Sequence, residues 1–133
     1  LNFVRSLGIQ HAFSPCTDND ILKYSNELNF NFIPGVSNIY DIKTALNNDC
    51  KFLKYYPAEK SGGITTLDSL IDKIELNKLK FIAMGGINLE NIKPYLNHKN
   101  IIGIGLSWVA EEALIEDSNW KEISKRAKLL LNL

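Results

Sequence analysis

Apolar residues along the chain gather in five short runs that are nearly continuous in hydrophobicity. They cover residues 10–15 (QHAFSP), 30–36 (FNFIPGV), 51–58 (KFLKYYPA), 80–87 (KFIAMGGI) and 101–109 (IIGIGLSWV). Runs of this kind, with β-branched and aromatic residues, are typical of strands that are buried on both faces of a parallel sheet, whereas half-exposed strands alternate. The pattern therefore predicts five parallel strands.

Between and after these runs, apolar residues recur every three or four positions, as along one face of a helix. This spacing predicts helices over residues 17–28, 37–48, 65–76, 88–96 and 119–133. Residues that commonly cap helix N-termini stand at the start of three of them: Thr17 or Asp18, Ser37 or Asn38, and Asn88. The first residues of the chain are typical of the end of a helix that leads into the first strand.

Strand and helix thus alternate five times. Ile33, Lys54, Ala83 and Ile104 mark four successive strands and are separated by 21, 29 and 21 residues. These spacings suit right-handed βαβ units, either in an open doubly wound sheet or in all or part of a (β/α)8 barrel. No linker or shift in composition divides residues 1–133, so we expect a single domain.

The composition is that of an ordinary globular domain, with 133 residues of which 45% are hydrophobic and 23% charged. Fifteen basic residues balance fifteen acidic ones, so no net field would attract nucleic acid or an anionic membrane. The apolar runs are much shorter than the roughly 18–20 residues of a membrane span, and no signal-peptide pattern opens the chain. We therefore expect neither a nucleic-acid partner nor membrane association.

The cysteines and histidines carry no recognisable motif. Cys16 and Cys50 lie far apart, which favours free thiols and a reducing, cytoplasmic setting over a disulfide. His11 and His98 are isolated from other ligand-type residues at metal-binding spacing. We expect no metal and no cofactor.

Two of the five predicted strand ends resemble anion-binding loops. In parallel α/β folds, ligands bind at the carboxyl ends of the strands. There, Gly85 and Gly86 allow close backbone approach and lead to a predicted helix N-terminus at Asn88, while Gly105 and Ser107 add a second glycine and a hydroxyl. Together these loops predict a phosphate site, although a Gly-Gly pair can also simply make a tight turn.

Lys54 stands inside an apolar strand, on the face of Phe52 and Tyr56 and opposite Leu53 and Tyr55. A buried ammonium is costly, so such a lysine is paired, neutral or functional. A desolvated lysine has a lowered pKa, and its free amine can attack a ketone to form an imine that accepts electrons when a neighbouring carbon–carbon bond breaks. The structural alternative is a lysine whose stem packs on Phe52 and whose ammonium pairs with a carboxylate or reaches solvent.

Other candidates have weaker support from the sequence. Glu59 follows the Lys54 strand and could be an acid/base, but a loop glutamate before KSGG is more often simply solvated. Cys16 ends a predicted strand without a histidine facing it. Tyr55 is expected to pack in the core, and Trp108 to fill the space under the last strand-end loop.

Four segments resemble the 2-keto-3-deoxy-6-phosphogluconate (KDPG) and 4-hydroxy-2-oxoglutarate aldolase family. They are FIPGVSN (residues 32–38), LKYYPAEKSGG (53–63), AMGGINLENI (83–92) and IGLSWV (104–109), in this order and spacing. The K-[FY]-[FY]-P-A-E element is the specific one, GGI and G-x-S-W support it, and the resemblance runs from Leu7 to the C-terminus.

The resemblance implies a class I aldolase of carbohydrate metabolism, in the Entner–Doudoroff pathway, on a (β/α)8 barrel that is usually a homotrimer. It would cleave 2-keto-3-deoxy-6-phosphogluconate or 4-hydroxy-2-oxoglutarate to pyruvate and an aldehyde, glyceraldehyde 3-phosphate or glyoxylate. The resemblance makes Lys54 the Schiff-base lysine. It assigns Gly85, Gly86 and Ser107 to the substrate phosphate, and Pro15 and Tyr56 to the pocket lining.

The chain departs from the family pattern in several places. Met84 replaces a threonine before the glycine pair, Leu106 replaces a glycine and is expected to crowd the phosphate loop, and Cys16 replaces a glycine. The resemblance also implies that this chain holds strands 4–8 of the barrel. The first three βα units, with a general-base glutamate and a carboxylate-binding arginine, would be supplied elsewhere.

Two other functions fit the same residues. A non-catalytic phospholigand-binding or structural partial barrel would account for Met84, Leu106 and the missing base. Another phosphate-binding barrel enzyme, such as one related to thiamine phosphate synthase, would explain the glycines but not Lys54.

Overall fold

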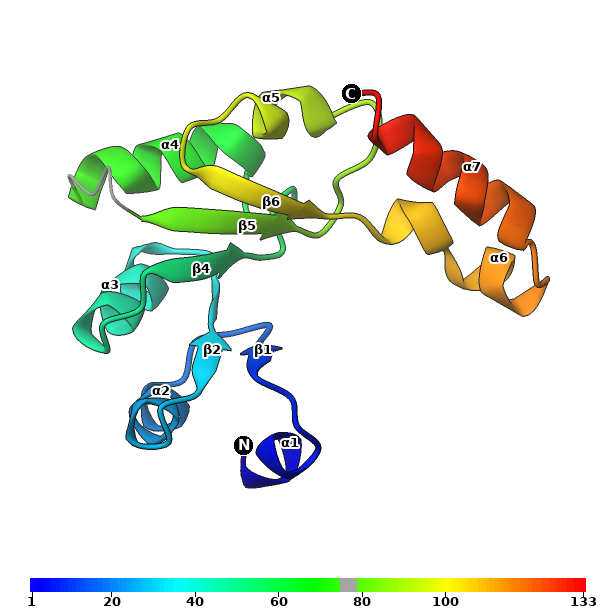
Figure 1. Cartoon of the computed structure of the whole chain (residues 1–133). Coiled ribbons are helices and arrows are strands. Elements are labelled where there is room, and N and C mark those ends of the chain that lie inside the picture. Colours follow the sequence, from blue (N-terminus) through cyan, green and yellow to red (C-terminus); the bar gives the residue numbers. More distant parts are fainter. Residues whose placement is uncertain (75–78) are drawn as a thin grey trace.

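The computed structural model describes residues 1–74 and 79–133, and within them helices alternate with short parallel strands (Figure 1). The strands are β1 (His11–Phe13), β2 (Asn31–Ile33), β3 (Gly35–Val36), β4 (Phe52–Tyr55), β5 (Lys80–Met84) and β6 (Ile101–Gly105). The helices are α1 (Asn2–Ser6), α2 (Asn19–Glu27), α3 (Ile39–Asn47), α4 (Gly63–Ile74), α5 (Ile92–Leu96), α6 (Glu112–Glu116) and α7 (Trp120–Leu130), with a 3-10 helix, η1 (Ser107–Ala110), after β6.

All strand pairs among these residues are parallel, and they form two sheets, β1–β2 and β3–β4–β5–β6. The five predicted strands are confirmed, but the run 30–36 is divided at Pro34, because proline has no N–H to donate to a ladder. The Pro34 carbonyl still accepts a hydrogen bond from the Lys54 N–H at 2.9 Å. The chain therefore passes from the first sheet into the second at Pro34.

Helices α3, α4 and α5 cover one face of the larger sheet. The strand residues on that face are fully buried: Leu53, Tyr55, Phe81 and Ala83. They pack against apolar helix residues, namely Ile42 and Ala45 of α3, Leu67, Leu70 and Ile71 of α4, and Ile92 and Tyr95 of α5. Alternation along the strands places the other residues, including Lys54, on the opposite face.

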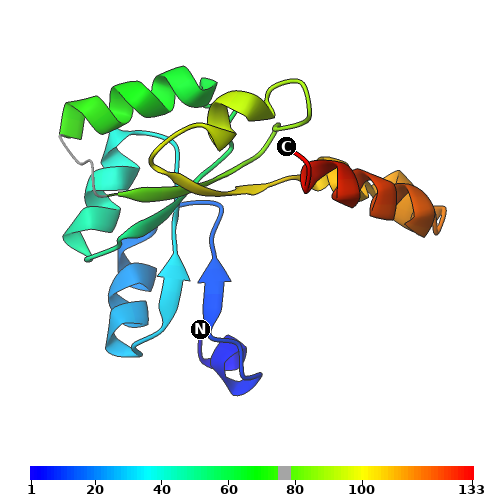
Figure 2. The ribbon, with the colours of Figure 1, turned by 45° about the horizontal axis from the view of Figure 1, so that its top comes forward.

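That opposite face is open to solvent among the described residues. Phe52 and Ile102 on the larger sheet are 48% and 53% exposed, and Phe13 on β1 is 47% exposed. Ile102 is displaced onto this face by a register shift between β5 and β6, where Phe81 pairs with Ile101 but Ile82 pairs with Gly103. Figures 1 and 2 show α6 and α7 projecting past the end of β6 instead of covering the sheet.

The predicted helices are confirmed, with one wrong start. Asp18 and Asn38 are the N-caps of α2 and α3, each accepting two backbone N–H bonds. Asn88 caps no helix, because α5 begins only at Ile92. Positions 75 and 76 of the predicted helix 65–76 lie outside the described residues. In the part of the chain that is described, no helix is long and apolar enough to span a membrane.

Candidate active site at the carboxyl ends of the strands

The strand register brings the predicted site residues to one edge of the sheets. Lys54 on β4 stands beside Gly35 of β3 on one side and Ile82 of β5 on the other, and Ile82 in turn pairs with Gly103 of β6. Because all strands are parallel, the loops that follow them meet at the same edge. Lys54 lies near that edge, one residue before the end of its strand.

Lys54 is partly exposed, so the prediction of a buried ammonium is wrong for this structure. The open face beside Phe52 explains the difference, since no described element covers the lysine from that side. Its Nζ lies 4.1 Å from the centroid of the Tyr56 ring, two residues along the chain. This cation–π contact holds the amine at the carboxyl edge of the sheet.

Gly35 lets the loop after β1 approach Lys54. A Cβ at Gly35 would lie 2.4 Å from both the carbonyl carbon and the oxygen of Pro15, so only glycine fits against this loop. The Thr17 hydroxyl donates to the Gly35 carbonyl at 2.7 Å and fixes the approach. Pro15, a predicted pocket residue, thus contacts the strand neighbour of Lys54.

The loop after β4 and the glycine pair after β5 form one unit. The N–H groups of Ala58 and Glu59 donate to the carbonyls of Met84 (2.8 Å) and Gly85 (3.1 Å). Gly85 has φ +98°, and a Cβ there would lie 3.2 Å from Cδ2 of Tyr56. A left-handed backbone and close contact both require glycine, so Gly85 is held beside the ring that contacts Lys54.

Glu59 contacts both Tyr95 and Gly86, and so links α5 to the glycine pair after β5. Its sequence context did not indicate this role. The Tyr95 hydroxyl donates a hydrogen bond to Glu59 Oε1, 36 residues away in the sequence. A Cβ at Gly86 would meet Cβ of Glu59 at 2.8 Å. Burial of Tyr95, which is 2% exposed, and its bond to Glu59 raise the pKa of this phenol well above its usual range. A buried tyrosine 36 residues from a glutamate leaves no local sequence signal.

The segment after Gly86 is folded on its own side chains. The Asn88 N–H donates to Asn91 Oδ1 at 2.7 Å, and the Glu90 N–H donates to Asn88 Oδ1 at 2.8 Å. Asn91 Nδ2 also donates to the Gly86 carbonyl at 3.1 Å. These N–H groups, which the sequence assigned to an anion, therefore already have acceptors.

Met84 fills the space between the two predicted phosphate loops. Met84 pairs with Gly105, and a Cβ at Gly105 would lie 2.7 Å from Cγ and 2.9 Å from both Sδ and Cε of Met84. The thioether therefore lies directly along the Gly105 backbone. Ile82 lies over Gly103 in the same way, with Cγ1 and Cγ2 at 3.7 Å from a Cβ built there. The wall beside Lys54 is thus formed by two apolar side chains of β5.

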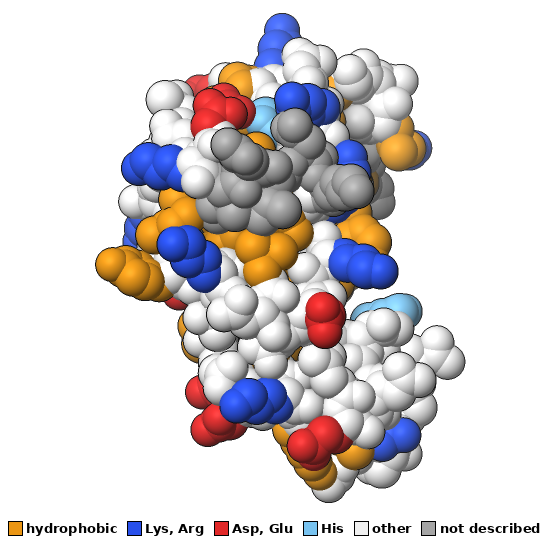
Figure 3. Space-filling view, turned by 90° about the vertical axis from the view of Figure 1, so that its left-hand side faces the viewer, with side chains coloured by type: hydrophobic (Ala, Val, Ile, Leu, Met, Phe, Trp, Pro, Cys, Tyr) orange, Lys and Arg blue, Asp and Glu red, His pale blue; other side chains and the backbone are white. Residues whose placement is uncertain are grey.

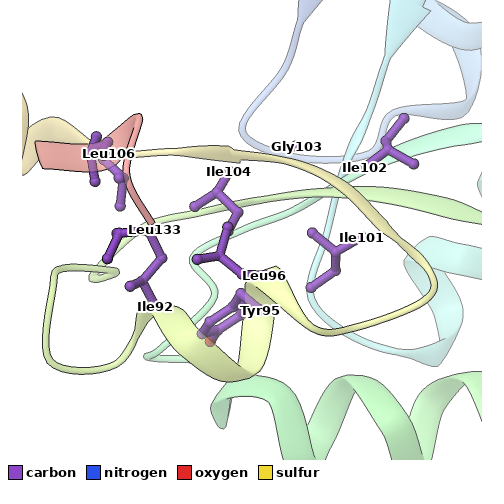
Figure 4. Close-up of a pocket in the computed structure, with 10 residues that line it drawn as sticks. Ile92, Tyr95, Leu96, Ile101, Ile102, Gly103, Ile104, Leu106 and Leu133 are labelled. Atoms are coloured by element: carbon purple, nitrogen blue, oxygen red, sulfur yellow. The ribbon is translucent and has the colours of Figure 1, made fainter. Parts of the chain in front are cut away.

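Ser107 is exposed at the start of η1, two residues after Gly105. Leu106 does not crowd this loop, contrary to the prediction, because its side chain packs on the helix-covered core. It lines an apolar pocket of about 320 Å³ between β6, α5 and the C-terminus (Figure 4). Trp108, expected to fill the space under the loop, stacks with the Arg126 guanidinium 4.8 Å from the ring centroid.

The remaining candidates add no catalytic group. Cys16 is exposed, and its N–H and carbonyl bond only to the Ser14 hydroxyl. Among residues 1–74 and 79–133, no group of three or more His, Cys, Asp or Glu side chains could hold a metal ion. Basic and acidic side chains are interspersed on the side of the molecule seen in Figure 3, in keeping with the zero net charge.

A sequence profile of the aldolase family described as "KDPG and KHG aldolase" matches residues 1–126. The chain belongs to this family. The match contains every strand and all the site residues described above. The resemblance carried by the KYYPAE element is thereby confirmed.

Individual KDPG aldolases agree with this assignment. The 2-dehydro-3-deoxy-phosphogluconate aldolase of Haemophilus influenzae is 34% identical over 129 residues, which are 97% of this chain and 60% of the relative. The KHG/KDPG aldolase of Escherichia coli is 30% identical over 94% of this chain and 58% of its own length. The chain therefore spans about 60% of the length of these relatives.

Solved structures give the same answer for the fold. The KDPG aldolase of Legionella pneumophila superposes with a TM-score of 0.86 at 29% identity, over 94% of this chain and 60% of that one. That protein was captured with pyruvate at low pH as a covalent carbinolamine intermediate. The α/β fold with parallel sheets is thus shared with KDPG aldolases.

Proposed function

We propose that this chain carries the Schiff-base half of a class I aldolase that cleaves a 4-hydroxy-2-keto acid, such as 2-keto-3-deoxy-6-phosphogluconate or 4-hydroxy-2-oxoglutarate, to pyruvate and an aldehyde. The observation that carries the proposal is the Lys54 amine at the carboxyl edge of β4, between Gly35 and Ile82 and against Tyr56, in a member of this family. The carbinolamine captured in the Legionella relative supports it.

In this proposal Lys54 Nζ attacks the 2-keto carbon to form a carbinolamine, which loses water to give an iminium. The C3–C4 bond then breaks, its electron pair moves towards the iminium nitrogen, and the C4 hydroxyl loses its proton as the aldehyde leaves. Protonation of the enamine at C3 and hydrolysis release pyruvate and the free lysine. Pro15 and Tyr56 flank the keto-acid end, while Gly85, Gly86 and Ser107 lie where the distal end of the substrate would reach.

We further propose that the sheets are part of a (β/α)8 barrel whose interior is the face that carries Lys54. The exposed apolar side chains Phe13, Phe52 and Ile102 on that face support this, because a barrel interior is filled by such residues. Further βα units, with the base and the arginine that binds the substrate carboxylate, would cover them.

The same open face favours a second candidate, a non-catalytic partial barrel. Release of pyruvate from each of the two substrates, followed by coupled reduction to lactate, separates the candidates. We expect slow release with the unmodified chain, because the general base would come from the further βα units, and less than about one-hundredth of that rate with Lys54→Ala, because no other group replaces a covalent catalyst. No release of pyruvate from either substrate, together with no borohydride-trapped pyruvate adduct on Lys54, would overturn the aldolase proposal in favour of the non-catalytic partial barrel.

A further inference from the structure

The Glu59 carboxylate is held by two helices, although Glu59 lies in an exposed loop. Its Oε1 accepts the hydrogen bond of the Tyr95 hydroxyl, and Tyr95 of α5 is buried in the core. A Cβ built on Gly63, the first residue of α4, would lie 3.4 Å from the same oxygen. Since the N-terminus of a helix favours a negative charge, α4 and α5 together fix this carboxylate.

The rest of Glu59 lies against the glycine pair after β5. A Cβ built on Gly86, where φ is +80°, would lie 2.8 Å from Cβ and 3.1 Å from Cγ of Glu59. The Glu59 N–H donates to the Gly85 carbonyl at 3.1 Å. Glu59 therefore contacts both glycines, one through its side chain and the other through its backbone.

The turn that carries Glu59 is also fixed from the core. The hydroxyl of Tyr55, which is fully buried, donates to the carbonyls of Ser61 at 3.2 Å and Gly63 at 3.0 Å. Tyr55 follows Lys54 directly in β4. The turn thus has a defined position relative to the Lys54 amine, and the contacts of Glu59 extend that position to the glycine pair.

The glycine pair leads into backbone donors that face no protein acceptor. Within residues 1–74 and 79–133, the N–H groups of Gly86 and Ile87 donate to no acceptor, and the Ser107 hydroxyl is exposed. A substrate bound covalently at Lys54 reaches these donors only if their distance from the amine matches its length. A misplacement of about 1 Å is enough to weaken such a contact strongly.

We propose that Glu59 is a positioning residue for the distal end of the substrate. With the Tyr95 hydroxyl as its donor, it holds the Gly85–Gly86 loop at the distance from Lys54 that a substrate bound at both ends requires. The carboxylate serves as an acceptor and a spacer, and it transfers no proton. The inference rests on the proposed aldolase function and adds a residue to it.

The test measures imine formation with acids that differ at their distal end. Pyruvate ends at C3 and reports the reactivity of Lys54 alone, while 2-keto-3-deoxy-6-phosphogluconate and unphosphorylated 2-keto-3-deoxygluconate differ by the phosphate. Each acid condenses through its 2-keto group with the Lys54 amine and releases one water. Borohydride then delivers hydride to the imine, which gives a stable secondary amine. Intact mass quantifies the adduct, including any pyruvate adduct left after cleavage, and yields a half-trapping concentration for each acid.

The unmodified chain should trap the phosphorylated acid at a concentration about tenfold or more below that of its unphosphorylated analogue. Glu59→Ala should remove most of this preference and leave pyruvate trapping as it was. Tyr95→Phe, which keeps Glu59 but removes its donor, should reduce the preference in the same direction. Glu59→Gln, which keeps an acceptor oxygen and the same carbon chain, should restore it.

Glu90→Ala is the matched control, because Glu90 is an exposed carboxylate on the segment after Gly86 and should leave the preference in place. The charge of Glu59 alone would act in the opposite sense. Removing a carboxylate near a bound phosphate would favour the phosphorylated acid, and it would do so in Glu59→Ala and Glu59→Gln alike. A merely structural role would weaken the trapping of all three acids together.

An unmodified chain without any preference for the phosphorylated acid would overturn this inference. So would an unchanged preference in both Glu59→Ala and Tyr95→Phe, or a loss in Glu59→Gln as large as that in Glu59→Ala. In each of these cases the pyruvate adduct would still form, so the aldolase proposal would stand. Absence of any pyruvate adduct on Lys54 would instead overturn the proposed function, and this inference with it.

Discussion

Replacing Gly35 by alanine should destabilise the chain and disturb the Lys54 pocket, although the backbone angles at this position are not left-handed. The added Cβ would lie 2.4 Å from two backbone atoms of Pro15 and 2.7 Å from the Ser14 carbonyl oxygen. Non-bonded carbon atoms normally approach to about 3.5–4.0 Å. Since all three neighbours are backbone atoms, no side-chain rotation relieves the clash, and the loop after β1 has to move by more than about 1 Å.

Overpacking of this kind costs about 1–3 kcal/mol, and a backbone clash belongs at the upper end of that range. Alanine also lowers the conformational entropy of the unfolded chain, which stabilises the folded state by about 0.4–1 kcal/mol. We therefore expect a net loss of about 2 kcal/mol in the free energy of unfolding. Gly103→Ala is the matched control, because its Cβ would meet Ile82 at an ordinary 3.7 Å. It should be neutral or stabilising by up to about 1 kcal/mol.

Urea unfolding followed by circular dichroism measures both variants, with the loss read from the midpoint at constant slope. Gly35→Ala should also trap less pyruvate on Lys54, because Pro15 is displaced from the neighbouring strand. Equal midpoints for the two alanine variants would refute the claim that Gly35 is required for close approach of this loop.

Three further predictions concern the packing around the site. Tyr95→Phe removes the hydrogen bond to Glu59 and should lower the free energy of unfolding by about 1–2 kcal/mol. Tyr40→Phe, at an exposed position, should change the free energy of unfolding by less than about 0.5 kcal/mol. Equal urea midpoints for the two variants would contradict a stabilising role of the Tyr95–Glu59 bond. Burial raises the pKa of Tyr55 to about 12, above its value of 10 in the unfolded chain, so stability should be full below pH 10 and fall between pH 10 and 12. Tyr55→Phe should flatten that fall in a series of urea titrations, and an unchanged profile would count against it. Asp18→Ala should lower the free energy of unfolding by about 1 kcal/mol, because the N-cap of α2 is lost. Asp18→Asn, which keeps a capping oxygen, should retain most of this stability. An equal loss in both variants would show that the charge of Asp18 matters and its capping hydrogen bonds do not.

Much of the fold could be predicted because local signals agree with one another. The continuous apolar runs identified every strand position, and the caps Asp18 and Asn38 stand where helix periodicity begins. Asn88 misled the prediction because an Asn can close a turn as readily as it caps a helix. Here Asn88 Oδ1 accepts from the Glu90 N–H, and the Asn88 N–H donates to Asn91 Oδ1. The division at Pro34 was readable in principle, since proline has no N–H.

The candidate site was predictable only where a motif records it. The KYYPAE element located Lys54, and parallel topology brought Pro15, Tyr56 and Gly85 to the same edge of the sheets. The contacts of Glu59 with Tyr95 and of Met84 with Gly105 join residues 36 and 21 positions apart and depend on register and rotamer, which no local pattern encodes. The exposure of Lys54 likewise depends on what covers the sheet, which is a property of the assembled fold.

Reductive trapping of pyruvate tests most directly whether Lys54 is a Schiff-base lysine. The chain is incubated with pyruvate and borohydride, and the modified residue is located by peptide mass, with Lys54→Ala and with Lys51→Ala, an exposed lysine in the same segment, as the matched pair. We predict one pyruvyl adduct on Lys54 that persists in Lys51→Ala and disappears in Lys54→Ala. An adduct spread over several lysines, or one that survives in Lys54→Ala, would contradict the account.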